Sequence, residues 1–123
     1  MGYESRLYVV ERNAHKNRKG EPSWVYGEKI AMFNLCCMGR DWDIDGIFSE
    51  PIDFAIEYDA KGNDVYEDKY GQHCGMSDID TVIESLEEVA EHDDYRRIEP
   101  VLCLLKGFDK SRWGDLRVVH YGY

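Results

Sequence analysis

The clearest pattern of apolar and polar positions lies in residues 77–108. Its first half repeats apolar residues three and four positions apart, with acidic residues on the opposite side. A second apolar run follows a short acidic break. Residues at this spacing share one side of a helix, so the pattern predicts two amphipathic helices, at about 77–92 and 96–107. The first helix has its apolar stripe at Ile79, Val82, Ile83, Leu86, Val89 and Ala90.

The ends of both helices carry ordinary stop and start residues. Ser77 followed by Asp80 resembles a capping box with Asp in place of Glu, so we expect the first helix to begin at Ser77. Pro100 fits the first turn of the second helix, where a missing N–H is harmless. Gly107 is a typical helix stop.

Segments rich in β-branched and aromatic residues predict strands on both sides of the helical block. They are residues 6–12, 24–26, 53–59, 64–67 and 116–123. Residues 60–63 are expected to form a turn and residues 13–22 a loop, whereas residues 39–51 fit either a loop or a single turn. The apolar run over residues 30–38 fits either a central strand or a short buried helix. We expect a strand, because a hairpin with the first strand would bury it.

Strand signals that stand before and after a helical block are typical of an α+β fold. We therefore expect a single domain over residues 1–123, with an antiparallel sheet of about five strands and the two helices packed on one face. The chain shows neither a signal-peptide pattern nor an apolar run long enough to span a membrane. We expect a cytoplasmic protein whose four cysteines are free thiols.

The formal net charge of −10 is unevenly distributed. Residues 41–94 contain 18 acidic and two basic residues, whereas the rest of the chain contains seven acidic and 13 basic ones. The middle is thus strongly acidic and the flanks are basic. Such asymmetry bears on binding partners and association rates more than on the fold.

The acidic side of the first helix is the main candidate interface. On a helical wheel its five carboxylates fall within about 100° of arc. Repulsion between neighbours three and four apart costs a few tenths of a kcal/mol per pair, which interspersed lysines would avoid. The face is either a solubilising surface or a docking surface for a basic partner. Its residues are Asp80, Glu84, Glu87, Glu88 and Glu91.

A second candidate is the loop at residues 41–46. Asp41, Asp43 and Asp45 at alternate positions, followed by Gly46, match the start of a calcium-binding loop. The twelfth position of such a loop needs a bidentate Glu, and Ile52 stands there. The alternatives are a calcium- or other metal-dependent domain and an acidic surface loop that joins the docking surface.

Catalytic chemistry has little support in the sequence. Cys74–His120 and Cys103–His92 are conceivable nucleophile–base pairs, but no motif places them together. The basic segment at residues 12–19 is expected to be a solvated hairpin tip rather than a nucleic-acid contact. We therefore expect a non-enzymatic protein without a cofactor.

Both ends of the chain, residues 1–11 and 105–116, resemble uncharacterised small proteins of phages and prophages of Gram-positive bacteria. The resemblance implies a phage-encoded inhibitor of a host system. Together with the acidic middle, it suggests a DNA mimic, such as an anti-CRISPR or anti-restriction protein. The expected partner is a basic surface of a nucleic-acid-binding host protein in the host cytoplasm, with no direct contact to nucleic acid or membrane.

Overall fold

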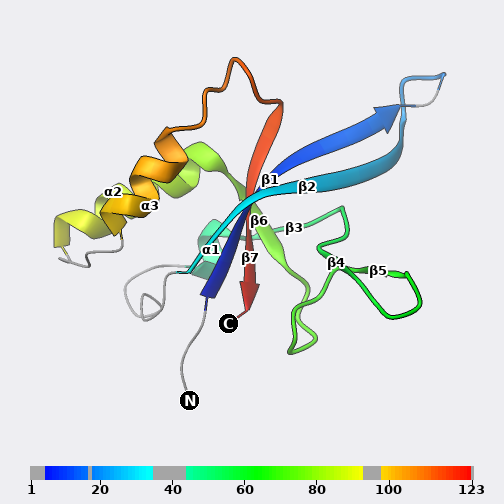
Figure 1. Cartoon of the computed structure of the whole chain (residues 1–123), viewed down its shortest axis with the longest axis horizontal. Coiled ribbons are helices and arrows are strands. Elements are labelled where there is room, and N and C mark those ends of the chain that lie inside the picture. Colours follow the sequence, from blue (N-terminus) through cyan, green and yellow to red (C-terminus); the bar gives the residue numbers. More distant parts are fainter. Residues whose placement is uncertain (1–4, 17, 35–43, 93–97, 123) are drawn as a thin grey trace.

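The computed structural model describes residues 5–16, 18–34, 44–92 and 98–122. Its centre is a five-stranded antiparallel sheet in the order β2-β1-β7-β6-β3. The strands are β1 (Ser5–Lys16), β2 (Pro22–Asn34), β3 (Glu50–Pro51), β6 (Gly75–Asp78) and β7 (Asp115–Gly122). Helices α2 (Ile79–His92) and α3 (Ile98–Lys106) lie side by side at one side of the sheet (Figure 1). The predicted α+β fold is confirmed.

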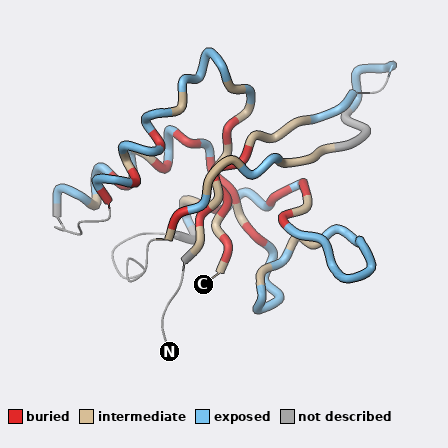
Figure 2. Tube along the Cα trace, in the orientation of Figure 1, coloured by how far each residue is buried: buried red, intermediate tan, exposed pale blue. Residues whose placement is uncertain are grey.

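Side chains of the central strands alternate between two apolar layers. Leu7 and Val9 of β1 face the helices, while Val10 faces the opposite layer. Strand β7 behaves in the same way, with Val118 on the helix side and Val119 on the other. The sheet is therefore buried on both faces at its centre, whereas the outlying loops are exposed (Figure 2).

The N-terminal hairpin is longer than the sequence suggested. Strand β1 continues to Lys16 and β2 starts at Pro22, so the expected loop at residues 13–22 is shortened from both ends, with a turn at residues 18–20. Gly20, with φ of 79°, supplies the left-handed conformation that this turn requires. Residues 30–34 extend β2, which confirms the strand prediction for that part of the apolar run; residues 35–38 lie outside the described residues.

The second face of the sheet is covered by a segment with little regular structure. Residues 53–59 were expected to form a sheet strand paired with residues 64–67. Only β4 (Glu57–Tyr58) and β5 (Asp64–Val65) pair, in a separate two-stranded sheet. The alternation of Phe54, Ile56 and Tyr58 in the sequence also predicted one buried side. Phe54 and Ile56 are buried, whereas Tyr58 is 70% exposed. Strands β3 and β6 take the two places in the main sheet instead.

The predicted helices are present with slightly shifted ends. Helix α2 begins at Ile79, because Ser77 is the third residue of β6 and is buried there. Helix α3 starts at Ile98 with Pro100 in its first turn, and the N–H of Gly107 bonds to the carbonyl of Cys103 at 3.0 Å. Residues 93–97 are not described. A single helical turn, α1 (Ile44–Ile47), precedes β3.

Candidate functional site

Asp78 holds the start of α2, in the role that the sequence suggested for Ser77. Its carboxylate accepts hydrogen bonds from the backbone N–H of Thr81 at 3.1 Å and from the Thr81 hydroxyl at 2.6 Å. Burial raises the pKa of Asp78, but the bonds from Thr81 outweigh it and leave the pKa below its usual value. An ionised N-cap is also favoured by the helix dipole, so this acid is a structural one.

The two sides of α2 are separated largely as predicted. Of the predicted apolar stripe, Ile79, Val82 and Leu86 are buried against the sheet. Ile83 and Val89 are half-buried, and Ala90 is exposed. The outer α2 face is exposed at all five acidic positions. It consists of Asp80, Glu84, Glu87, Glu88 and Glu91.

Two lysines from the C-terminal side of α3 partly neutralise this face. Lys110 forms an ion pair with Asp80, and Lys106 Nζ lies 3.6 Å from Glu87 Oε2. Each pair is exposed and contributes only about 0–1 kcal/mol. The sequence analysis missed both lysines. The sequence did contain a signal for these pairs, because only a short segment links the two helices. Two helices joined by a short link usually pack antiparallel, which places the end of α3 beside the start of α2.

The remaining carboxylates of the face form an uncompensated row. Within the described part of the chain, no Lys or Arg forms an ion pair with Glu84, Glu88 or Glu91. Their Cα positions climb the helix by about 6 Å and about 4.5 Å in succession, from the rise of 1.5 Å per residue. This unpaired row is a rigid series of negative charges fixed on a packed helix.

Many acids on the other side of the molecule have local structural tasks. The Asp59 carboxylate accepts hydrogen bonds from the N–H groups of Lys61 and Asn63, at 2.9 and 2.8 Å. Asp68 repeats the arrangement nine residues later, accepting from Tyr70 and Gln72 at 2.8 and 3.1 Å. Both turns contain a glycine with φ near 80°, Gly62 and Gly71. The bonds from Asn63 lower the pKa of Asp59, which keeps this turn acid charged.

Asp53 is also engaged within the fold. Arg12 Nε lies 2.9 Å from Asp53 Oδ1, and Arg12 Nη1 lies 3.5 Å from Asp115 Oδ2. The hydrogen bond from Arg12 lowers the pKa of Asp53 against the effect of its burial. Arg12 therefore ties the base of the N-terminal hairpin to the segment that covers the second face.

The calcium-loop candidate lies only partly within the described residues. Asp41 and Asp43 lie outside the described residues, as does the side chain of Asp45. Gly46 sits inside the helical turn α1 rather than at a left-handed bend. Ile52, at the twelfth position, is 3% exposed and packs in the apolar layer of the second face. Among the described residues, no group of three His, Cys, Asp or Glu side chains is arranged to hold a metal ion.

The candidate nucleophile Cys74 lies in an environment that opposes thiolate formation. It is 3% exposed, in the apolar layer that includes Tyr121. Burial, reinforced by nearby carboxylates, raises its pKa to about 12. His120 stacks on Phe48, with ring centroids 5.5 Å apart, toward the helix-side layer. These two residues are therefore on different sides of the sheet; His92 of the other candidate pair has no described side chain.

We expect the cysteines to differ sharply in reactivity. Cys74 and Cys103 are both free thiols, and Cys103 is exposed on α3. In the native protein, iodoacetamide should alkylate Cys103 at least about a hundredfold faster than Cys74, because only the thiolate reacts and Cys74 is buried with a raised pKa. Peptide mass spectrometry of a labelling time course measures both rates. Equal rates in the folded protein would contradict this description of Cys74.

An open depression of about 540 Å³ lies beside β2 on the second face. Its charged lining residues are Lys29 and Glu57. The Lys29 ammonium is 4.7 Å from the centre of the Tyr8 ring. Burial, followed by the nearby Glu57 carboxylate, raises the pKa of Tyr121 to about 12. Both charged groups thus have aromatic neighbours within the fold.

Comparisons with known proteins return no relative. No family model matches the chain, and neither a curated protein nor a solved structure does so. Among the helices that the structure describes, none has the length and apolarity needed to cross a membrane.

Proposed function

We propose that this protein is a non-enzymatic acidic binding protein whose outer α2 face docks on a cationic, nucleic-acid-binding surface of another protein. The observation that carries the proposal is the unpaired row of Glu84, Glu88 and Glu91. Other acids of the middle segment serve caps, turns and internal ion pairs, as Asp78, Asp59 and Asp53 do. The glutamates of the row have no such task in the described structure.

A fixed row of carboxylates can replace phosphates in a groove lined with Lys and Arg. Buried Val82 and Leu86 anchor the row to the sheet, so little conformational entropy is lost when it docks. A protein of this kind would inhibit its partner by competing with DNA or RNA. This is the DNA-mimic role, within a host cell, that the resemblance of the chain ends to phage proteins suggests.

The partner would be captured from host lysate on the immobilised protein and identified by mass spectrometry. Replacing Glu84, Glu88 and Glu91 together by Gln should then slow association and weaken binding by about tenfold or more, equivalent to about 1.4 kcal/mol. The reason is lost electrostatic steering, which salt also screens over a Debye length of about 8 Å at physiological ionic strength. Surface plasmon resonance at several salt concentrations measures both effects.

A matched variant separates local from general charge effects. Replacing Glu28, Glu57 and Glu67 by Gln changes the net charge equally, at exposed positions outside the two helices. It should bind nearly as tightly as the wild type. The proposal fails if both triple variants lose affinity equally, if neither does, or if the bound protein leaves the partner's DNA or RNA in place.

A further inference from the structure

The β1–β2 hairpin continues as an arm beyond the rest of the sheet. Pairing between β1 and β7 ends at Arg12 and Asp115, whereas pairing between β1 and β2 continues to Lys16 and Pro22. Figure 1 shows this two-stranded arm projecting from the body. Its outer described residues are exposed (Figure 2).

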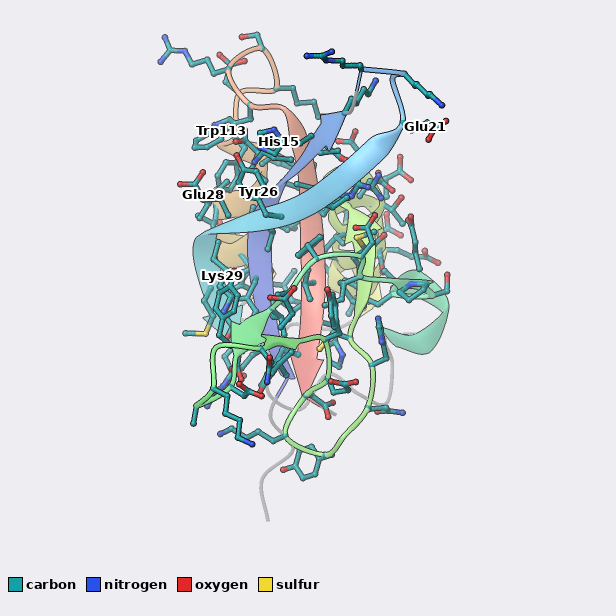
Figure 3. All side chains as sticks on the ribbon, turned by 90° about the vertical axis from the view of Figure 1, so that its right-hand side faces the viewer. His15, Glu21, Tyr26, Glu28, Lys29 and Trp113 are labelled. Atoms are coloured by element: carbon teal, nitrogen blue, oxygen red, sulfur yellow. The ribbon has the colours of Figure 1, made fainter. Side chains whose placement is uncertain are left out.

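The arm is ordered by contacts at its base and along its length. Arg12 is bound to Asp53 at the base, and His15 stacks on Tyr26 with ring centroids 5.7 Å apart (Figure 3). An isolated two-stranded ribbon is marginally stable in water. These two contacts add to the pairing of β1 with β2 along the arm.

The tip of the arm is cationic. Lys16, Arg18 and Lys19 are exposed there, beside a single acid, Glu21. Within the described residues, Lys16 and Arg18 have no ion-pair partner. We refer to Lys16, Arg18 and Lys19 as the cationic tip.

The cationic tip and the unpaired row lie at opposite ends of the molecule. The arm projects to one side in Figure 1, and the helices occupy the other. Separation in a projection is a lower limit to separation in space, so the tip cannot reach its own α2. The cationic tip and the unpaired row can therefore meet only between two copies.

We propose that the cationic tip of one copy docks on the outer α2 face of a second copy. The contact pairs Lys16 and Arg18 with Glu84 and Glu88, groups that no described residue of their own chain neutralises. Since the two surfaces differ, the association is head-to-tail. It needs no foreign partner, and it would compete with the partner proposed above for the same face.

A second copy fits the tip better than nucleic acid does. Non-specific DNA binding is driven by the phosphates that a protein neutralises, and the tip offers only three cations on a chain of net charge −10. That net charge also repels a second copy at long range. At an ionic strength of about 0.1 M the Debye length is about 10 Å, so distant repulsion is screened while touching pairs remain.

Sedimentation equilibrium of the full chain tests the proposal. At about 0.1 M salt the weight-average mass should rise above that of the monomer as concentration increases, and it should return to the monomer value near 1 M, where the Debye length is about 3 Å. K16E/R18E and E84K/E88K should each remain monomeric. A chain with all four changes has the wild-type net charge, and the charges of its tip and its row are both reversed. The two surfaces are again complementary, so this variant should associate. A mixture of the two double variants should also associate.

Matched controls identify the surfaces. K61E/K69E and E28K/E67K change the net charge equally at other exposed sites and should not mimic the loss. Circular dichroism verifies that each variant is folded. The proposal is overturned if the wild type stays monomeric at millimolar concentration, if the fourfold variant does not associate, or if the controls abolish association as well. It is also overturned if the tip binds a labelled oligonucleotide in an anisotropy titration and K16E/R18E removes that binding.

Discussion

Replacing Gly75 with alanine should destabilise the protein by about 3 kcal/mol, an effect at the upper end of overpacking changes. A Cβ at this position would lie 1.9 Å from the backbone oxygen of Phe48. Relief requires movement of the main chain, because a carbonyl cannot rotate away as a side chain can. That movement would break the pairing of β3 with β6 at Pro51 and Gly75. Urea denaturation followed by circular dichroism measures the loss.

Gly114 provides the control for this change. A Cβ there would have its nearest neighbour, Glu11 Oε2, at 3.7 Å, an ordinary contact distance. Gly114→Ala should therefore alter the free energy of unfolding by less than about 1 kcal/mol, as surface changes usually do. If the two alanine variants were equally stable, the close approach of Phe48 to β6 would not exist in solution.

The sequence predicted the elements with long periodic patterns and missed those that depend on distant contacts. Helix α2 was found because apolar residues repeat every three to four positions along it. Strand β7 was found because its segment is rich in β-branched and aromatic residues. Strand β3 has two residues, both exposed, and carries no such pattern. It is a strand only because β6 lies beside it. Local alternation also cannot say which sheet a strand joins, so Phe54 was predicted to be buried but in the wrong kind of element.

The same limit applies to the candidate interface. Amphipathicity was sufficient to predict that the acids of α2 face solvent. It could not show that Lys106 and Lys110 return to Glu87 and Asp80, since those pairs require the antiparallel placement of α3. The tertiary structure therefore narrows the candidate interface from the five acidic residues of the outer α2 face to the unpaired row, whose three glutamates form no ion pair with a described lysine or arginine.

The acidic residues of the middle segment fall into two kinds. Some acids stabilise the structure directly, as Asp78 caps α2 and Asp59 closes a turn. Others, such as Glu84 and Glu88, form no ion pair with a described residue and lie on a helix whose inner side packs on the sheet. Neutralising an acid of the first kind should lower stability, because its hydrogen bonds are lost. Neutralising Glu84 or Glu88 removes repulsion and should leave stability equal or slightly higher, so binding and folding effects can be separated experimentally.

Replacing Phe54 with alanine should destabilise the protein by about 3–5 kcal/mol. The side chain is 1% exposed and fills the apolar layer of the second face, although its segment has almost no regular structure. A cavity there removes the main anchor of the segment between β3 and β4. Hydrogen exchange should show lost protection first at Ile56 and Cys74, whose N–H groups bond to Val65 and Tyr66. Once the global loss of stability is subtracted, the amide protection factors of α2 should equal those of the wild type.

Gly27 offers an internal test of that packing. A Cβ at Gly27 would lie 2.5 Å from Phe54 Cδ2 and 2.6 Å from Val10 Cγ1, so Gly27→Ala alone should cost about 1–3 kcal/mol. In the background of Phe54→Ala the ring is gone, and only the clash with Val10 remains. The double variant should thus be more stable than the sum of the two single effects predicts, by about 0.5–1 kcal/mol. Phe54→Ala combined with Gly114→Ala should instead be additive, because Gly114, in the loop before β7, has Glu11 of β1 as its neighbour rather than Phe54. If the Gly27 pair were additive too, Phe54 would not pack on the β2 backbone, and the cover of the second face would be held in another way.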